Sequence, residues 1–313
     1  MNAFVQAVRD HAPLILDGGL ATELEARGHD LGTELWSARL LHDNPKAIVG
    51  VHQAYLEAGA EIITTASYQA SREGFMKLGL SAFAADQLIV ESVNLACKAR
   101  ESFMRKQPKK AFRPLIAASI GPWGATLHDG SEYTGHYEIP EEKLKSFHTA
   151  RLQLFEDSDA DVLACETIPS HVEGRVLHQI LRLVEKPAWV SFSCRDGRHI
   201  SDGTPLRDMA AMFAEHRMVV ALGVNCTPPQ HITSLIHELH AAAPDKPIIV
   251  YPNSGERWEA SDNNWHGTVE PLDVAEAALG WREAGAAIIG GCCRMGPAHI
   301  RAIRQALKNG APK

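Results

Sequence analysis

The sequence predicts a single (β/α)8 TIM barrel domain that spans residues 1–313. Eight short apolar segments recur along the chain, and most of the stretches between them carry apolar residues at helical spacing. The short segments are nearly continuously apolar, which is typical of parallel strands covered on both faces. A length of 313 residues suits one large barrel. A doubly wound sheet is the alternative, but no G-x-G-x-x-G motif follows the first segment.

The predicted strands are short and come at intervals along the whole chain. They cover residues 14–19, 61–67, 115–121, 162–168, 188–194, 219–226, 247–253 and 286–293. The predicted helices cover residues 44–58, 82–104, 141–156, 171–184, 229–243, 271–284 and 297–307. Helices often begin at a proline and end near a glycine, and Gly59 and Gly285 follow two of these segments.

The composition indicates a soluble globular protein, with 45% hydrophobic and 22% charged residues. A net charge of −7 gives no electrostatic basis for binding nucleic acid. The N-terminal residues lack the basic and apolar regions of a signal peptide, and no apolar run approaches the ~18 residues of a membrane span. We therefore expect a cytoplasmic protein with no membrane association and no obligate protein partner. In that compartment the six cysteines would stay reduced.

Polar residues gather at the C-terminal ends of the predicted strands, where the active sites of barrel enzymes lie. The first strand ends in Asp17-Gly18-Gly19, and the second ends in Thr64-Thr-Ala-Ser-Tyr68. The fourth ends in Cys165-Glu166-Thr167, and the seventh continues into Tyr251-Pro-Asn-Ser-Gly-Glu256. A packed core requires none of these residues, so their accumulation at one end indicates a site.

Three cysteines share this end of the barrel. Cys226 ends the sixth predicted strand, and Cys292 and Cys293 end the eighth. These strands flank the seventh, so their tips are two strand spacings apart, roughly 10 Å. Three thiols in this arrangement suit a zinc ion with one open coordination position. Adjacent strand residues point to opposite faces, so the paired thiols require a backbone distortion, which we attribute to Gly290 and Gly291. Buried packing and a redox pair are the alternatives.

At this point the sequence resembles a known family. The segments Asp17-Gly-Gly19, Gly223-Val-Asn-Cys226 and Gly290-Gly-Cys-Cys293 resemble the three signatures of the homocysteine S-methyltransferases, in the same order and spacing. The resemblance covers nearly the whole chain. Further segments are similar to the bacterial and plant subgroup that uses S-methylmethionine or S-adenosylmethionine: residues 17–28, Asp129-Gly-Ser-Glu-Tyr133, Leu163-Ala-Cys-Glu-Thr167, residues 201–208 and residues 251–256.

The resemblance implies a set of site residues and one cofactor. It implies one Zn²⁺ per chain on Cys226, Cys292 and Cys293. It implies that Asp17 and Glu166 hold the amino group of homocysteine, and that backbone amides near Gly18 and Thr64 take its carboxylate. The expected donor-site residues lie at the same rim: Trp36, Tyr68, Asn225, Ser254 and Trp265.

The function implied is methyl transfer from a sulfonium donor to the thiol of L-homocysteine, which gives methionine. Metal coordination deprotonates a thiol whose pKa is otherwise ~8.5, and the thiolate is the nucleophile. A site that activates water more often has histidine or carboxylate ligands, so three cysteines argue against a hydrolase. The alternatives are a betaine- or folate-dependent homocysteine methyltransferase and a non-catalytic barrel stapled by zinc. A thiol oxidoreductase is a further class, which metal content would distinguish.

Overall fold

In the computed structural model, the described residues are 2–31, 36–107, 112–127, 129–255, 257–259, 264–266 and 271–309. Eight parallel strands form one sheet. In sheet order they are β1 (Leu14–Ile15), β10 (Ala286–Ile289), β7 (Ile248–Tyr251), β6 (Val219–Asn225), β5 (Ala188–Phe192), β4 (Val162–Ile168), β3 (Leu115–Ile120) and β2 (Ile62–Thr64). A parallel bridge between Leu16 and Ile62 joins the first strand to the second, so the sheet closes into a barrel.

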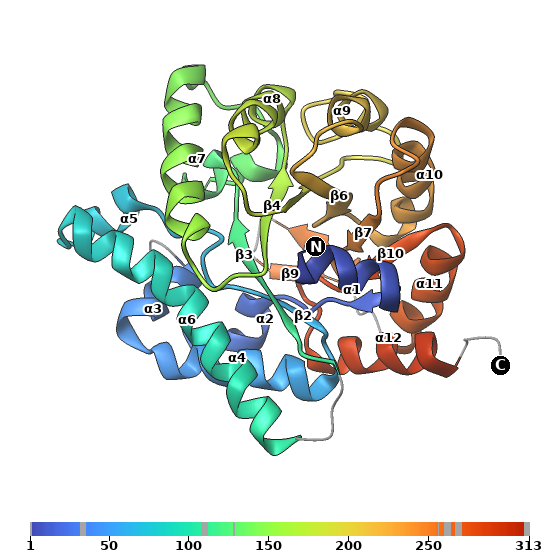
Figure 1. The fold of residues 1–313 in the computed structure, drawn as a ribbon, viewed down its shortest axis with the longest axis horizontal. Helices are drawn as coiled ribbons and strands as arrows, with labels where there is room; N and C mark the ends of the chain where they lie inside the picture. Colours follow the sequence, from blue (N-terminus) through green and yellow to red (C-terminus); the bar gives the residue numbers. More distant parts are fainter. Residues whose placement is uncertain are drawn as a thin grey trace.

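Helices surround the barrel (Figure 1). They are α1 (Ala3–His11), α2 (Leu20–Ala26), α3 (Leu40–Asp43), α4 (Pro45–Ala58), α5 (Arg72–Lys77), α6 (Ala82–Lys106), α7 (Glu141–Glu156), α8 (His171–Ile180), α9 (Leu206–Phe213), α10 (Ile232–Ala242), α11 (Pro271–Glu283) and α12 (Pro297–Asn309). Short 3₁₀ turns add η1 (Trp36–Arg39), η2 (Trp123–Thr126), η3 (Ser131–Tyr133), η4 (Leu181–Leu183) and η5 (Pro229–His231). This arrangement confirms the predicted (β/α)8 barrel.

All eight predicted strands are confirmed, but most end earlier than predicted. The eighth was expected to reach Cys293 and ends at Ile289, and the sixth ends at Asn225, just before Cys226. The polar residues at these ends leave the ladder and form turns. The sequence analysis also missed α9, which connects β5 to β6, and the short hairpin of β8 (Arg257–Glu259) with β9 (Asn264–His266).

Local signals in the sequence fix where helices begin and end. Asn44 accepts a hydrogen bond from the Ala47 amide at the start of α4, where Pro45 is the first helical residue. The same helix ends at Gly59, whose φ of 109° is the left-handed conformation that favours glycine. Serine caps begin α5, α6 and α8.

The barrel interior is a hydrophobic core that α1 closes at the N-terminal ends of the strands. Phe4 of α1 packs against Trp189, with ring centroids 5.8 Å apart. The core inside the barrel consists of buried residues from α1 and from the strands: Phe4, Ala7, Val8, Leu14, Leu16, Ile62, Leu115, Ala117, Val162, Ala164, Trp189, Ala221, Ile249, Tyr251 and Ile288. With this end filled, any cavity that reaches the interior has to open at the opposite end.

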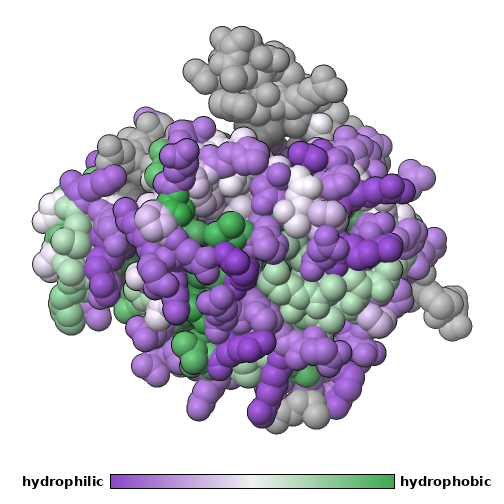
Figure 2. All heavy atoms as spheres, turned by 90° about the horizontal axis from the view of Figure 1, so that it is seen from above, coloured by the Kyte–Doolittle hydropathy of each residue, from purple (hydrophilic) through white to green (hydrophobic). Residues whose placement is uncertain are grey.

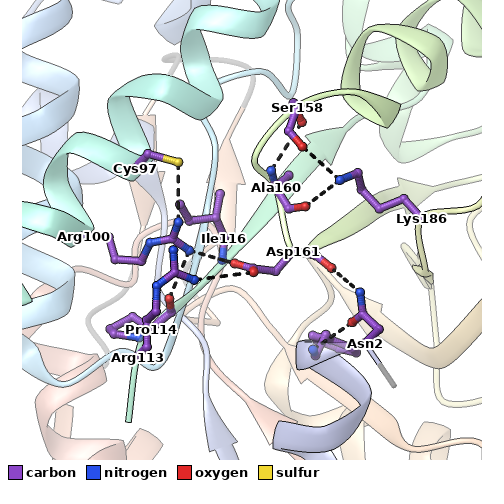
Figure 3. A network of polar contacts seen from close by, with 11 residues as sticks. Asn2, Cys97, Arg100, Arg113, Pro114, Ile116, Ser158, Ala160, Asp161 and Lys186 are labelled. Atoms are coloured by element: carbon purple, nitrogen blue, oxygen red, sulfur yellow. Dashed lines mark hydrogen bonds and ion pairs between the residues drawn. The ribbon is translucent and has the colours of Figure 1, made fainter. Parts of the chain in front are cut away.

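A network of charged groups stabilises the same N-terminal end, which we call the base (Figure 3). The carboxylate of Asp161 accepts hydrogen bonds from Arg100 Nη1 and from the Ile116 amide, both at 2.8 Å. Arg113 lies 3.8 Å from the other carboxylate oxygen. Lys186 donates to two backbone carbonyls, those of Ser158 and Ala160. The half-buried Asp161 is therefore neutralised by cations of its own chain.

Hydrophilic residues dominate the face of the molecule in Figure 2, and hydrophobic residues occupy patches between them. Among the helices that the structure describes, none is long and apolar enough to cross a bilayer.

Candidate active site

Three thiols converge at the C-terminal ends of the strands, which we call the rim. The Sγ atom of Cys226 lies 2.9 Å from that of Cys292 and 3.4 Å from that of Cys293. All three Sγ atoms lie within 4.8 Å of one another, and in the described residues this is the one group of histidine, cysteine or acidic residues placed to hold a metal. The other cysteines lie elsewhere: Cys165 and Cys194 are buried, and Cys97 is on α6.

The backbone that carries these thiols is anchored to the segment that follows β7. The Cys226 amide donates to the Tyr251 carbonyl at 3.2 Å, and the Cys292 amide donates to the Pro252 carbonyl at 2.7 Å. Cys293 accepts at its carbonyl from the Ser254 amide at 3.1 Å. Cys226 has a φ of +49°, an uncommon conformation for a residue with a side chain. This strand order confirms the expectation that the cysteine-bearing strands flank the seventh.

The role predicted for Gly290 and Gly291 needs a correction. Neither has the positive φ that only glycine adopts readily, and the paired thiols lie in a turn beyond β10. A Cβ atom on Gly290 would lie 2.6 Å from Leu16 Cβ, and one on Gly291 would lie 2.6 Å from Met295 Cβ. The glycines therefore permit close packing between β1, the end of β10 and the turn that follows. The turn itself directs both thiols to one side.

The donor set fits a thiophilic cation. Hydrogen bonding to its two neighbouring sulfurs, together with burial, raises the pKa of the Cys292 thiol. Three thiolates at these separations repel one another, so a cation that binds all three is required for them to be ionised together. Zinc prefers tetrahedral sites rich in sulfur, and three protein ligands leave a fourth position for substrate.

Asp17 lies at the same rim, immediately after β1, and its carboxylate is held in place by Thr64. The Thr64 amide donates to Asp17 Oδ2 at 2.8 Å, and the Thr64 hydroxyl contacts both carboxylate oxygens. The Asp17 residue is 2% exposed. Burial raises the pKa of Asp17 well above its usual value, the Thr64 hydrogen bonds oppose this shift, and the charge of Glu166 adds to it. The two carboxylates are thus close enough to repel each other.

The Thr64 hydrogen bond bears on one expectation. The sequence analysis expected backbone amides near Gly18 and Thr64 to take the substrate carboxylate, and in this structure the Thr64 amide itself donates to Asp17. Thr64 is therefore better described as the residue that orients Asp17. Gly18, expected beside it, lies against Tyr55 and the Met295 carbonyl so closely that a Cβ atom would overlap that carbonyl. Glycine is required there for packing.

Glu166 lies near the C-terminal end of β4 and accepts hydrogen bonds from two neutral hydroxyls. Ser119 donates to Oε1 through a short hydrogen bond, and Tyr251 donates to Oε2 at 2.9 Å. Glu166 is 7% exposed, and burial raises its pKa while these two hydrogen bonds and the charge of Arg151 lower it. In the described part of the chain, neither Glu166 nor Asp17 forms an ion pair with a lysine, arginine or histidine.

A buried polar layer joins Glu166 to the thiol cluster. Tyr251 shares a hydrogen bond with Ser191 at 2.6 Å, and Ser191 donates to Asn225 Oδ1 at 2.9 Å. Asn225 also binds the amide and hydroxyl of Thr167, at 2.8 and 2.7 Å. Thr167 follows Glu166 and has a φ of 60°, while Asn225 directly precedes Cys226. The layer therefore fixes the acid and a thiol relative to each other.

This layer changes the interpretation of Asn225, which was expected at the donor site. Asn225 is fully buried, and its amide is engaged with Thr167 and Ser191. It thus acts as a support for neighbouring site residues. The sequence analysis gave no role to Ser119 or Ser191, although a signal was available. Each sits in a strand at the period-two position that points inward, and a serine there in an apolar strand is unusual.

Of the other donor-site candidates, Tyr68 is the one whose pKa responds to the charged groups of the rim. Burial raises the pKa of Tyr68, and the negative charges of Glu132 and Cys226 add to this shift. Ser254 is buried beneath the rim, where its amide holds the Cys293 carbonyl. The backbone of Trp36 lies in η1 and that of Trp265 in β9, and the side chains of both are outside the described part of the structure.

Comparison with known proteins matches this architecture and site to one family. The sequence profile of the homocysteine S-methyltransferases matches residues 14–307. The chain belongs to the homocysteine S-methyltransferase family. It is therefore a methyltransferase, as the resemblance of its strand-end motifs predicted.

Several members of this family are similar over nearly their whole length. Homocysteine S-methyltransferase YbgG of Bacillus subtilis is 48% identical over 303 residues, which is 96% of each chain. Selenocysteine Se-methyltransferase of Brassica oleracea is 44% identical over 94% of this chain and 88% of its own. A crystal structure of the Escherichia coli homocysteine methyltransferase MmuM in a metallated form has a TM-score of 0.86 and 43% identity, covering 96% of this chain and 98% of that one.

One further part of the site in this family member comes from the insertion between β3 and α7. Its η3 turn carries Glu132, which is buried, and Tyr133, whose hydroxyl hydrogen-bonds the Cys293 sulfur. The insertion is held by Glu173 of α8, which accepts from the Trp123 amide at 2.7 Å and from the Tyr137 hydroxyl. The sequence analysis quoted this segment as a motif but assigned it no function.

Proposed function

We propose that this protein transfers a methyl group from a sulfonium donor, S-methylmethionine or S-adenosylmethionine, to the sulfur of L-homocysteine, giving methionine. The observation that carries the proposal is the juxtaposition of two kinds of groups. Three convergent thiols lie beside two buried carboxylates that have no cation of the described chain as a partner. A zinc ion that only stapled the barrel together would not require these carboxylates.

Cys226, Cys292 and Cys293 are the residues that would hold one zinc ion per chain. Their sulfurs form the only described cluster of this kind, and the metallated form of the related Escherichia coli enzyme supports a metal in this family. Zinc at this position would lower the pKa of the homocysteine thiol, so that its sulfur is a nucleophilic thiolate near neutral pH.

Asp17 and Glu166 would bind the ammonium group of homocysteine. The two carboxylates raise each other's free energy by repulsion, and burial penalises their charge. An ammonium group between them would relieve both effects. Thr64 on one side and Ser119 with Tyr251 on the other fix the carboxylates, so homocysteine would meet a preorganised receptor.

The transfer step is a displacement at carbon. The homocysteine sulfur, having lost its proton to solvent, attacks the methyl carbon and forms a new S–C bond. The S–C bond of the donor breaks, and its electron pair returns to the donor sulfur, which leaves as a neutral thioether. With S-methylmethionine as donor, both products are methionine. Positioning of the two sulfurs in line with the methyl group supplies much of the rate enhancement.

A sulfonium donor suits this rim better than a neutral one. The charges of Glu132 and Cys226 act on Tyr68, and the face of an aromatic ring attracts a positive sulfur, with cation–π attraction worth about 0.5–2 kcal/mol. Betaine is also cationic and is the main alternative donor, and a methylated folate is the second.

A methyl-donor panel tests the proposal. Purified protein loaded with zinc is incubated with homocysteine and each of S-methylmethionine, S-adenosylmethionine, betaine and methyltetrahydrofolate, and methionine is quantified. We expect the highest specificity constant with S-methylmethionine. Methionine formation from betaine or folate alone would reject the sulfonium donor, and no methionine from any donor would reject the function. Selenocysteine is a useful second acceptor, because the Brassica relative is named for its methylation.

A further inference from the structure

Glu132 is a third acid of the rim, and the proposed steps above do not assign it a ligand. The residue is 8% exposed, and its Oε2 atom is buried with no hydrogen-bond partner. Its carboxylate accepts a hydrogen bond from its own backbone amide. No ion pair in the described part of the chain involves Glu132. A buried carboxylate in this condition is costly to the fold, so its retention requires an explanation.

The position of Glu132 is fixed by the surrounding structure. Its backbone amide packs against Gly124, where a Cβ atom would lie only 2.7 Å from that nitrogen, and its carbonyl accepts from Ser193 Oγ at 3.4 Å. The insertion that carries it is tied to Glu173 by the Trp123 amide and the Tyr137 hydroxyl. His148 Nε2 contacts the same Glu173 carboxylate at 2.7 Å. Several independent contacts thus fix the backbone that carries the Glu132 carboxylate.

The neighbours of Glu132 place it on the thiol side of the rim. Its charge acts on Tyr68, and the charge of Cys293 acts on it. The adjacent Tyr133 hydrogen-bonds the Cys293 sulfur. Burial raises the pKa of Glu132 to about 7, and the nearby negative charge of Asp129 contributes in the same direction. All of these groups are negative or neutral. None of them would therefore repel a cation that entered this region or compete with it for the Glu132 carboxylate.

We propose that Glu132 binds the positive charge of the methyl donor and so selects cationic donors over neutral ones. This inference rests on the proposed function, because it assigns a residue to the donor half of that site. The homocysteine ammonium group already has Asp17 and Glu166, which come from β1 and β4. Glu132 comes from a different element, η3, its charge acts on Tyr68, and one of its carboxylate oxygens is buried without a partner.

The test compares Glu132→Gln with Glu138→Gln, an exposed acid of the same insertion. Both zinc-loaded variants are assayed for the KM of S-methylmethionine and of homocysteine. The isosteric Glu132→Gln removes charge with little change in shape. A charge-assisted contact of usual strength predicts that the KM of S-methylmethionine rises about tenfold or more. The KM of homocysteine, the zinc content and the melting temperature should stay close to those of Glu138→Gln.

Inhibition by two fragments of the donor shows which charge Glu132 binds. Trimethylsulfonium has the positive sulfur and no ammonium group, while methionine has the ammonium group and a neutral sulfur. Weaker inhibition of Glu132→Gln by either fragment, relative to Glu138→Gln, supports the inference and identifies the charge. Unchanged inhibition by both fragments together with an unchanged KM for S-methylmethionine would overturn it. An equal rise in the KM of homocysteine would also overturn it, because a general disturbance of the rim would then explain the result.

Glu132→Asp guards against a loss of folding in the glutamine variant. Aspartate keeps the charge, so this variant should retain a lower KM for S-methylmethionine than Glu132→Gln, and the reverse order would count against the inference. A separate result would reject the proposed function: the unaltered protein would form no methionine from any sulfonium donor. Full activity with S-methylmethionine and no effect of Glu132→Gln would reject this inference alone.

Discussion

The carboxylates at the two ends of the barrel have opposite kinds of partner. At the base, the side chain of Asp161 is 14% exposed and bonds to the guanidinium of Arg100 at 2.8 Å, with Arg113 nearby (Figure 3). At the rim, Asp17 and Glu166 are more deeply buried and receive hydrogen bonds only from neutral hydroxyls and amides of the described chain. The base acid completes an internal ion pair, whereas the rim acids are arranged for a cation supplied from outside.

This difference affects how the stability of the folded protein depends on pH. Burial raises the pKa of Asp17 and of Glu166 in the folded chain above their values in the unfolded chain. For each acid, between its pKa in the unfolded chain and its higher pKa in the folded chain, the folded state binds more protons. The ligand-free protein therefore loses stability as pH rises through this window. Above this window both carboxylates are charged without an ion pair in the described chain, and the charge of Arg151 offsets only part of the cost at Glu166, so stability is reduced. A bound ammonium group would offset this loss of stability, so the folded protein should be more stable with homocysteine bound than without it.

The largest effect should come from the thiols of the rim. Replacing Cys226, Cys292 or Cys293 by alanine should reduce the zinc content from about one per chain to near zero and turnover to background, because two sulfurs form a poor site. Cys97→Ala is the matched control, since Cys97 lies on α6 near Arg100 and outside the cluster. Metal analysis and the methionine assay measure both. Full zinc binding by Cys292→Ala would contradict the assignment of the metal ligands.

The second effect should be confined to the base. Asp161→Asn removes one partner of the ion pair and leaves Arg100, 4% exposed, as a buried uncompensated charge. Breaking such a pair costs about 3–5 kcal/mol of unfolding free energy. Denaturant unfolding measures the loss, and the KM of homocysteine in the surviving folded protein should be unchanged. A variant with full stability and weak homocysteine binding would remove the distinction between the two ends.

The converse result is expected at the rim. Asp17→Asn and Glu166→Gln each remove a charge that has no cationic partner in the described chain, so stability at neutral pH should be equal or higher. Homocysteine binding should weaken by about 1.5–3 kcal/mol for each charge-assisted contact that is lost. Calorimetric titration of the zinc-loaded variants with homocysteine measures this change. If both variants kept the original affinity and lost stability instead, the acids of the rim would be structural, like Asp161.

The two ends also differ in how far the sequence predicts them. The barrel, its eight strands and the position of the three thiols follow from apolar periodicity and motif spacing, which report on burial and on strand order. The support for Asp17 and Glu166 does not. Thr64, Ser119 and Tyr251 reach these carboxylates through side-chain rotamers and inter-strand register, which a single sequence does not specify.

The misjudged residues show the same limit. Gly290 and Gly291 were expected to let the backbone bend, whereas close contacts are what require glycine there. Gly290 packs against Leu16, which is distant in sequence, and Gly291 packs against Met295 across the turn. Asn225 was expected at the donor site, and in the structure its side-chain amide points inward and binds Thr167. A strand end reveals that a residue is near the site, and only the register shows which face it occupies.

The smallest expected effect tests how finely the rim is tuned. Ser119→Ala removes the hydroxyl that donates to Glu166 Oε1 and leaves the Tyr251 hydrogen bond in place. Because that hydrogen bond lowers the pKa of Glu166, its loss raises this pKa further. Glu166 has to be ionised to bind an ammonium group, so the acid limb of kcat/KM for homocysteine should move to higher pH, by about one unit if the contact has usual strength.

The pH profile separates this tuning from a packing defect. Ser92→Ala is the control, since Ser92 is a fully buried serine of α6 whose hydroxyl donates to the Ile89 carbonyl within the helix. Both variants lose one buried hydroxyl, and both should show a similar small change in stability. Only Ser119→Ala should shift the acid limb, while kcat/KM well above that limb stays near the original value. A uniform decrease at every pH would mean that Ser119 contributes to packing alone, and the hydroxyls around Glu166 would then not control its charge.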